Sequence, residues 1–335
     1  MGTSVQDLLV SLLKLHGAVG REEAVAAWLG EALRPHVDEL RTDALGNLIA
    51  VKKGSGAGKR VLLSAHMDHI GFMVIDADEH GFLRVCGVGG IRVPASLGQP
   101  VVFANGVRGV ISAEQDIEGN PGMEHLFIDI GASTREEALM QAGIGDVAVY
   151  AAPVALLGDH RIAAPAMDDR VGCALLAWLL ISVGEDCPNE LIGVFSAQEE
   201  VGLRGARVAA YAEKPDIGIA LDVTFTGDTP GVKPKMAVAL GKGPAIKVMD
   251  RSLISTPLVR DAMIEAAKEA GIPYQLEVLP FGGTDAGAIQ LSRAGVPSGV
   301  LSIATRYVHS AAETIDTRDL EQGARLLLAL ANREY

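Results

Sequence analysis

Two glutamates stand side by side after a strongly apolar segment of this 335-residue chain. Residues 191–195 have the composition of a buried strand, and the chain then runs into Glu199 and Glu200. A carboxylate at such a position can bind a metal ion or accept a proton. Adjacent residues leave a strand end in different directions, so one carboxylate can bind metal while the other faces a water molecule. The pair is therefore a candidate for two separate roles.

Other apolar segments lead into further residues of the same kind. His66 follows VLLSA, Asp222 follows IGIAL, and GVLSIATRYV leads to His309. A further segment, APAMDDRVG, places Asp168 and Asp169 at the start of a predicted helix. Ligands of open α/β sheets gather beyond the carboxyl ends of the strands. These side chains are therefore expected to converge on one crevice.

Each of these residues has a simpler explanation when it is taken alone. A single histidine at a strand end is more often a hydrogen-bonded side chain than a ligand. Asp168 or Asp169 alone would be explained as a helix N-cap, and the two glutamates as a solvated turn. The recurrence of His, Asp or Glu at the same end of successive strands nevertheless favours a shared site.

As a set, these residues have the composition of a two-metal site. Two imidazoles and several carboxylates suit Zn²⁺, the expected ion, or Co²⁺ or Mn²⁺, whereas Mg²⁺ and Ca²⁺ favour oxygen ligands alone. Two ions need a bridging carboxylate, terminal ligands on each side and an unattached base for the water. The three cysteines are widely spaced and form no CxxC pair, which favours a reducing, cytoplasmic location.

Alternating strands and helices would position these residues. Helical periodicity over 4–16 and 21–34 precedes two predicted strands, NLIAVKK and RVLLSAH. The later pattern predicts helices at 169–183, 203–212, 256–270, 285–293 and 317–332, and strands at 190–197, 217–222, 274–279 and 299–303. Such alternation predicts an α/β fold with a mostly parallel central sheet flanked by helices.

The segment between these two parts has a different residue pattern. Short β-type runs alternate with Gly, Asn and Asp turns over residues 71–161, which predicts a small all-β domain. We therefore expect a discontinuous catalytic domain, 1–70 and 162–335, interrupted by an inserted β domain at 71–161.

Composition limits the partners of the chain. Hydrophobic residues make up 49% of it and mean hydropathy is +0.26, enough for a substantial core. The formal net charge of −13 repels nucleic acid and anionic membranes. No apolar run reaches the roughly 18–20 residues of a membrane span. We therefore expect neither nucleic acid nor a membrane as a partner.

Six separated motifs together resemble those of one known family. They are SAHMDHIGFMV, AMDDRVGCAL, SAQEEVGLRGA, ALDVTFTGD, GGTDAGAI and TRYVHS. Their order and spacing are similar to those of the tetrahedral glutamyl/leucyl metallo-aminopeptidases of the zinc-exopeptidase superfamily. The resemblance runs from the first predicted helix to the last.

The resemblance implies a role for each motif residue. His66, Asp168 and Asp222 would hold one metal ion. Asp168, Glu200 and His309 would hold the other, with Asp168 as the bridge.

Two further side chains receive roles in the same way. Glu199 would be the general base that takes a proton from the bridging water and passes it to the leaving amine. Asp68, two residues after His66 in an extended segment, would orient the imidazole. In GGTDAGAI two interpretations stay open: the motif lines the substrate pocket, or Thr284 or Asp285 caps helix 285–293.

The resemblance also implies an activity and an assembly. The expected function is dinuclear metal-dependent hydrolysis of N-terminal residues from peptides. The alternative is a dinuclear deacylase or carboxypeptidase acting on N-acyl amino acids; a non-catalytic scaffold is disfavoured by the intact base and ligand set. The inserted β domain would mediate dimerisation, and family members commonly form hollow shells of twelve subunits.

Overall fold

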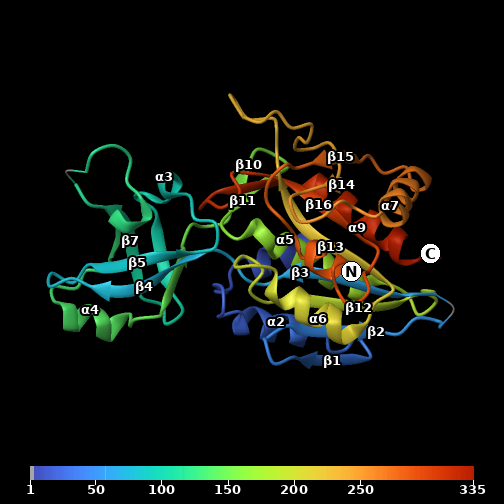
Figure 1. Ribbon diagram of the computed structural model, residues 1–335, viewed down its shortest axis with the longest axis horizontal. Helices are drawn as coiled ribbons and strands as arrows, with labels where there is room; N and C mark the ends of the chain where they lie inside the picture. Colours follow the sequence, from blue (N-terminus) through green and yellow to red (C-terminus); the bar gives the residue numbers. More distant parts are fainter. Residues whose placement is uncertain (1–3, 57, 116) are drawn as a thin grey trace.

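The computed structural model describes residues 4–56, 58–115 and 117–335, which form two lobes (Figure 1). The larger lobe is a mixed sheet with helices on both faces, and the smaller is a closed barrel. The strands of the large sheet are β1 (Glu39–Thr42), β2 (Leu48–Lys52), β3 (Arg60–His66), β10 (Ala155–Leu157), β11 (Arg161–Ala164), β12 (Glu190–Ser196), β13 (Ile217–Phe225), β14 (Ala245–Met249), β15 (Gln275–Val278), β16 (Ser298–Arg306) and β17 (Glu313–Asp316).

The large sheet is parallel at its centre and in the attached pair β14–β15, and antiparallel elsewhere. Its order is β1-β2-β12-β3-β13-β16-β17-β11-β10, with β14 and β15 attached beside β16. The neighbours β12, β3, β13 and β16 run parallel, whereas β1, β2, β17, β11 and β10 pair antiparallel. Short connections such as β10–β11 and β16–β17 cannot make the crossover that a parallel pair requires. The expectation of a mostly parallel sheet is corrected accordingly to a mixed sheet.

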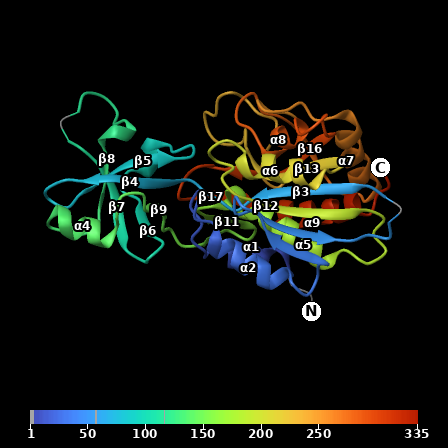
Figure 2. The same ribbon diagram turned by 60° about the horizontal axis from the view of Figure 1, so that its bottom comes forward.

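Helices cover both faces of this sheet. They are α1 (Val5–Leu12), α2 (Glu23–Leu33), α5 (Met167–Ser182), α6 (Arg204–Glu213), α7 (Pro257–Glu269), α8 (Asp285–Gln290) and α9 (Thr317–Ala331). Alternate residues of β3 serve the two faces: Val61 and Leu63 join the core with α1 and α5, and Leu62 joins the core with α6 and α8. Figure 2 shows these two helix layers on opposite sides of β3.

The helices and strands expected from the sequence are present in the large lobe. Their bounds differ from the expected ones by a few residues, most at α1, which ends at Leu12 instead of residue 16. Strands β1, β14 and β17 were not expected, because each is short and mixes polar with apolar residues. None of the helices in the described residues has the length and hydropathy of a membrane span.

The small lobe is a closed barrel with the strand order β4-β5-β8-β7-β6-β9. Its elements are β4 (Gly71–Ala77), β5 (Leu83–Val88), α3 (Val93–Ser96), β6 (Pro100–Phe103), β7 (Arg108–Ala113), η1 (Met123–His125), β8 (Leu126–Asp129), α4 (Arg135–Gln141) and β9 (Val147–Tyr150). The expected short strands are present, together with short helices. Helix α4 carries a signal visible in the sequence, since Thr134 caps its amide at Glu137 with a 3.2 Å hydrogen bond.

The barrel ends earlier than the expected domain boundary at residue 161. Its last strand stops at Tyr150, and β10 and β11 pair with β17 in the large sheet. The chain enters the barrel directly after β3, so the carboxyl end of β3 faces the junction of the two lobes (Figure 1). The predicted site residues lie at this junction.

Candidate metal centre

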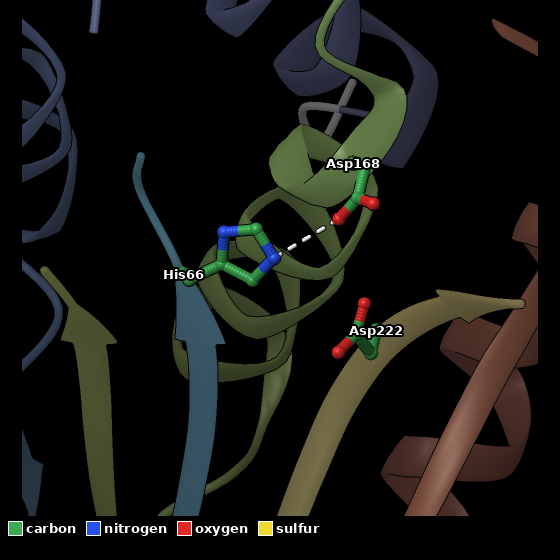
Figure 3. Close-up of side chains that lie close together, drawn as sticks. All are labelled: His66, Asp168 and Asp222. Atoms are coloured by element: carbon green, nitrogen blue, oxygen red, sulfur yellow. Dashed lines mark hydrogen bonds and ion pairs between the residues drawn. The ribbon is translucent and has the colours of Figure 1, made fainter. Parts of the chain in front are cut away.

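His66 ends β3 and points its ring across the end of the sheet. Its Nδ1 lies 2.9 Å from the backbone oxygen of Asp68, and its Nε2 lies 3.0 Å from Oδ1 of Asp168 (Figure 3). If Nδ1 carries the proton and donates to that carbonyl, Nε2 keeps a lone pair directed at Asp168. This tautomer suits a metal ligand.

The two aspartates at the start of α5 have different surroundings. Asp169 is the capping residue: its Oδ1 accepts the amide of Gly172 at 2.8 Å, and its Oδ2 accepts the amide of His66 at 3.2 Å. Asp168 instead lies between two imidazoles. Its Oδ1 is 3.0 Å from His66 Nε2, and its Oδ2 is 3.3 Å from His309 Nε2. A carboxylate with one oxygen on each side has the arrangement of a bridging ligand.

The structure brings the predicted ligands into two groups that share Asp168. His66, Asp168 and Asp222 form one group, and Asp168, Glu200 and His309 form the other. Within each group the ligand atoms lie within 4.8 Å of one another. Asp222 lies within β13, which continues to Phe225, and its carboxylate faces Asp168 and His66 (Figure 3).

Asp68 holds the backbone of both glutamates. Its Oδ1 accepts the amide of Glu199 at 2.9 Å, and its Oδ2 accepts the amide of Glu200 at 3.1 Å. Oδ1 of Asp68 also lies 3.7 Å from Nδ1 of His66, within ion-pair distance but beyond hydrogen-bond distance. The backbone oxygen of Asp68 makes the hydrogen bond with Nδ1 instead.

The side chains of the two glutamates diverge from this shared anchor. Oε1 of Glu200 lies 3.1 Å from Nε2 of His309, while Oε2 of Glu199 lies 3.9 Å from Nε2 of His66. Glu200 therefore belongs to the second ligand group. Glu199 lines the same cleft without belonging to either group.

The buried carboxylates carry more negative charge than the surrounding residues balance. Burial raises the pKa of Glu199 and Asp222 well above their usual values, and neighbouring carboxylates add to this rise. Burial raises the pKa of Glu200 as well, and the nearby Asp168 carboxylate adds to this rise. Such a deficit of positive charge fits divalent cations.

The pKa values of His309 and Asp168 are set by their contacts with charged neighbours more than by burial. Burial alone would lower the pKa of His309, but the Asp168 and Glu200 carboxylates outweigh it and raise this pKa to about 12. Burial would likewise raise the pKa of Asp168, yet hydrogen bonds from His309 and His66 hold it below its usual value. The carboxylates that favour a positive charge on the His309 imidazole would equally favour a metal ion between them.

Glu313 was not among the predicted site residues, although it supports two of them. Its Oε1 accepts the amide of His309 at 2.7 Å, and its Oε2 accepts the amide of Asp168 at 3.0 Å. Burial and the neighbouring Asp168 raise the pKa of Glu313 to about 8. The position of Glu313 four residues after His309 was the signal available in the sequence.

The barrel lobe contributes a glycine segment to the site. The Nδ1 atom of His309 lies 2.9 Å from the backbone oxygen of Gly90. A Cβ atom on Gly90 would lie 2.5 Å from that same Nδ1, and a Cβ on Gly89 would lie 3.2 Å from the side chain of Glu200. Glycine is therefore required where this segment passes the second ligand group.

Left-handed backbone conformations of residues other than glycine concentrate next to the ligands. Gln198 (φ 58°) precedes the two glutamates, Ala166 (φ 62°) precedes the two aspartates, and His309 itself has φ 63°. Such conformations are costly for L-residues and tend to cluster at functional sites. No pattern in the sequence predicted these left-handed conformations.

The ligands open into a cleft with a volume of about 310 Å³. Apolar side chains and glycines form much of its remaining wall: Leu203, Val223, Phe225, Leu279, Gly282, Gly283 and Val308. Thr284 also lines the cleft and makes no capping hydrogen bond, while Asp285 accepts the hydroxyls of Ser64 at 2.6 Å and Ser196 at 2.5 Å. These contacts favour pocket lining over helix capping for GGTDAGAI.

The chain is similar to known aminopeptidases along most of its length. The family model for M42 glutamyl aminopeptidase matches residues 46–326. A lysyl aminopeptidase from Pyrococcus furiosus is 38% identical over 338 residues, which cover 97% of this chain and 96% of its own.

Two solved structures share the fold. An aminopeptidase from the archaeon Desulfurococcus kamchatkensis superposes with a TM-score of 0.94 at 38% identity, covering 98% of this chain and 94% of its own. The Pyrococcus horikoshii TET1 peptidase has a TM-score of 0.87 at 32% identity, covering 98% of this chain and 99% of its own. The chain belongs to the M42 glutamyl aminopeptidase family, a family of peptide hydrolases.

Proposed function

We propose that this aminopeptidase works with two divalent metal ions per chain, with Zn²⁺ as the expected ion and Co²⁺ or Mn²⁺ as alternatives. His66, Asp168 and Asp222 would hold one ion, and Asp168, Glu200 and His309 the other. When bound, the two ions supply positive charge that polarises the scissile carbonyl and acidifies the attacking water. The substrate is the N-terminal residue of a peptide.

Glu199 is the proposed general base. It accepts a proton from the attacking water and delivers it to the leaving amine nitrogen. Burial raises the pKa of its carboxyl well above the usual value, which brings the affinity for a proton toward that needed near neutral pH. Asp68 keeps Glu199 in place through the backbone amide at 2.9 Å and takes no part in proton transfer.

One observation carries this proposal above the others. The amides of Glu199 and Glu200 share one carboxylate anchor, yet their side chains diverge toward different imidazoles. Glu200 thereby joins a ligand group and Glu199 does not. A single turn would then supply both a metal ligand and an unattached base.

The substitution Glu199→Gln tests the proposal. Loss of the proton acceptor should lower turnover of aminoacyl amides by about 10²–10⁴-fold. Metal content should stay at two ions per chain, since Glu199 is outside both ligand groups. A matched control, Glu321→Gln, changes an exposed glutamate on α9 and should leave both quantities unchanged. Near-normal turnover of the Glu199 variant would exclude its role as base.

A deacylase or carboxypeptidase acting on N-acyl amino acids is not favoured. The same ligand set serves such enzymes, but the compared proteins named here are aminopeptidases or a TET peptidase. The distinction can be measured by comparing free-amino substrates with their N-acetylated forms. An aminopeptidase should hydrolyse only the free-amino form.

We also propose a homo-oligomer built from dimers, with twelve subunits as the full assembly and a cytoplasmic location. The similar Pyrococcus horikoshii TET1 peptidase can assemble into a tetrahedron or a large octahedral shell. The barrel lobe has apolar side chains in exposed positions, notably Met140 at 82% and Ile144 at 66% exposure. All three cysteines are free, which suits a reducing compartment.

The proposed domains are a catalytic domain, 1–70 and 162–335, and an inserted domain at 71–161 that mediates dimerisation. The closed barrel supports this division, although its own strands end at Tyr150.

A further inference from the structure

A buried lysine stands in the wall of the cleft beside the ligands. Lys247, from β14, is the single lysine or arginine among the described residues that line the cleft. Its side chain has no exposed surface and forms an ion pair with Glu277. The two residues are direct cross-strand partners, because β14 and β15 pair in parallel with Lys247 opposite Glu277. The register of two strands therefore sets this pair.

Other contacts hold the acceptors of the lysine in place. Thr224, on β13, donates its hydroxyl to Oε1 of Glu277 at 2.7 Å. Oδ2 of Asp250 lies 3.8 Å from Nζ of Lys247, while Oδ1 of Asp250 accepts the amides of Ser252 at 2.7 Å and Leu253 at 2.9 Å. Two fixed carboxylates thus face one ammonium group. The charge of Lys247 is therefore fully compensated within the protein, with one carboxylate in excess.

The rest of this wall is apolar. Leu203, Val223, Leu279 and Val308 line the cleft together with Phe225. The ring of Phe225 packs edge-on against Phe281, with 5.2 Å between ring centroids. A side chain entering here exchanges water for hydrocarbon, which favours an apolar group.

We propose that this wall receives an uncharged, apolar N-terminal side chain such as that of leucine, and that Glu277 excludes an acidic one by neutralising Lys247. This inference rests on the proposed aminopeptidase function. An acidic side chain would add a third carboxylate to one ammonium and would be buried without its own partner. A basic side chain would lose its hydration in a wall that is otherwise apolar and whose carboxylates already contact Lys247. Glu277 acts through Lys247 and is therefore a positioning residue.

Selectivity among substrates tests this inference. The metal-loaded wild type should show a higher kcat/KM on leucyl than on glutamyl or lysyl 4-nitroanilide. Glu277→Gln removes the neutralising charge, so the ratio of glutamyl to leucyl kcat/KM should rise at least about tenfold. Glu277→Asp keeps the charge and should keep the wild-type ratio.

Two further variants separate charge from packing. The double change K247M/E277Q removes the ammonium as well, so the gain on the glutamyl substrate should disappear. Glu265→Gln, at a half-exposed position on α7 that pairs with Arg333, is the matched control and should leave the ratio unchanged. A general loss of stability would lower both rates and leave their ratio as it was.

Binding provides a second readout that does not depend on turnover. Calorimetry with free L-leucine and L-glutamate should give tighter binding of leucine to the wild type, and a shift toward glutamate in Glu277→Gln. Equal or better use of glutamyl substrate by the wild type would overturn the inference, as would an unchanged ratio in folded Glu277→Gln. If the wild type hydrolyses none of the amides, the proposed function fails, while the calorimetric affinities still decide the nature of the pocket.

Discussion

At the scale of single residues, the site depends on carboxylates that bind backbone amides. Asp68 fixes the turn that carries both glutamates, and Glu313 fixes the backbone of His309 and Asp168. These two carboxylates belong to neither ligand group. Removing such a support should disturb metal binding without removing any ligand.

Substitution of Glu313 tests whether a carboxylate outside the ligand groups supports metal binding. Glu313→Gln replaces one acceptor oxygen by an amide nitrogen, which cannot accept the N–H of His309 or Asp168. We expect metal affinity to fall by about 10–100-fold, measured by competition with a chelator. Glu321→Gln again serves as the control. An affinity within the error of the wild type would show that Glu313 only fills space.

The residue types of the site were readable from the sequence, but their supports were not. His66, Asp168, Asp222, Glu200 and His309 follow apolar segments, and the structure places them in two groups that share one aspartate. Which backbone amides a carboxylate binds depends on tertiary packing. Glu313 was therefore missed although it stands only four residues after His309, and the contacts of Asp68 with the amides of Glu199 and Glu200 were not predicted.

At the scale of elements, most candidate ligands lie on neighbouring strands or on the loops that follow them, and Asp168 lies at the start of α5. Helices and strands with clear periodicity were predicted to within a few residues, because burial on one or two faces determines their pattern. Strands β14 and β17 were missed, and β14 supplies Lys247. A strand that buries charged residues against a partner strand lacks the apolar pattern on which prediction depends.

The segment after β13 is tied to β16 by a partly buried ion pair. Arg306 donates Nε to Oδ1 of Asp228 at 2.9 Å and Nη2 to Oδ2 at 2.8 Å. Although burial alone would raise the pKa of Asp228, these bonds lower it from 3.8 to about 2. A carboxyl with a lowered pKa stabilises the folded state above the unfolded pKa and loses that effect as pH falls through the folded value.

We therefore expect the effect of Asp228→Asn to depend on pH. At neutral pH the substitution should reduce the free energy of unfolding by about 2 kcal/mol. The difference from the wild type should shrink as pH falls from about 4 to 2. Urea unfolding across this range measures it, with Asp159→Asn, an exposed aspartate beside β11, as the control. A difference that stays constant with pH would refute the electrostatic explanation.

At the scale of the whole molecule, the barrel lobe reaches the site and also presents exposed apolar residues. Gly90 contacts His309, while Met140 and Ile144 are largely exposed at the other end of the same lobe. The sequence predicted an inserted β module from its turn pattern. It did not predict that a glycine of this module contacts a metal-ligand candidate, since that contact depends on tertiary packing.

The assembly proposal leads to a prediction about native mass. The wild type should have a native mass that is a multiple of 35.0 kDa. The double change M140E/I144E should shift this mass downward, because charged groups on both partners cannot be buried in one interface. Leu291→Glu, at an equally exposed apolar position in the large lobe, should leave the mass unchanged. Native mass spectrometry gives the result.

An oligomer that survives M140E/I144E unchanged would place the interface elsewhere. Circular dichroism of each variant should match the wild type, so that a changed mass reports association and not unfolding.

The number of metal ions per chain tests the central claim most directly. Two ligand groups sharing Asp168 should give two ions per chain in the wild type and one in His309→Ala, which removes a ligand of a single group. Elemental analysis of the purified, metal-saturated proteins measures both values. One ion in the wild type, or two retained in His309→Ala, would contradict the dinuclear site.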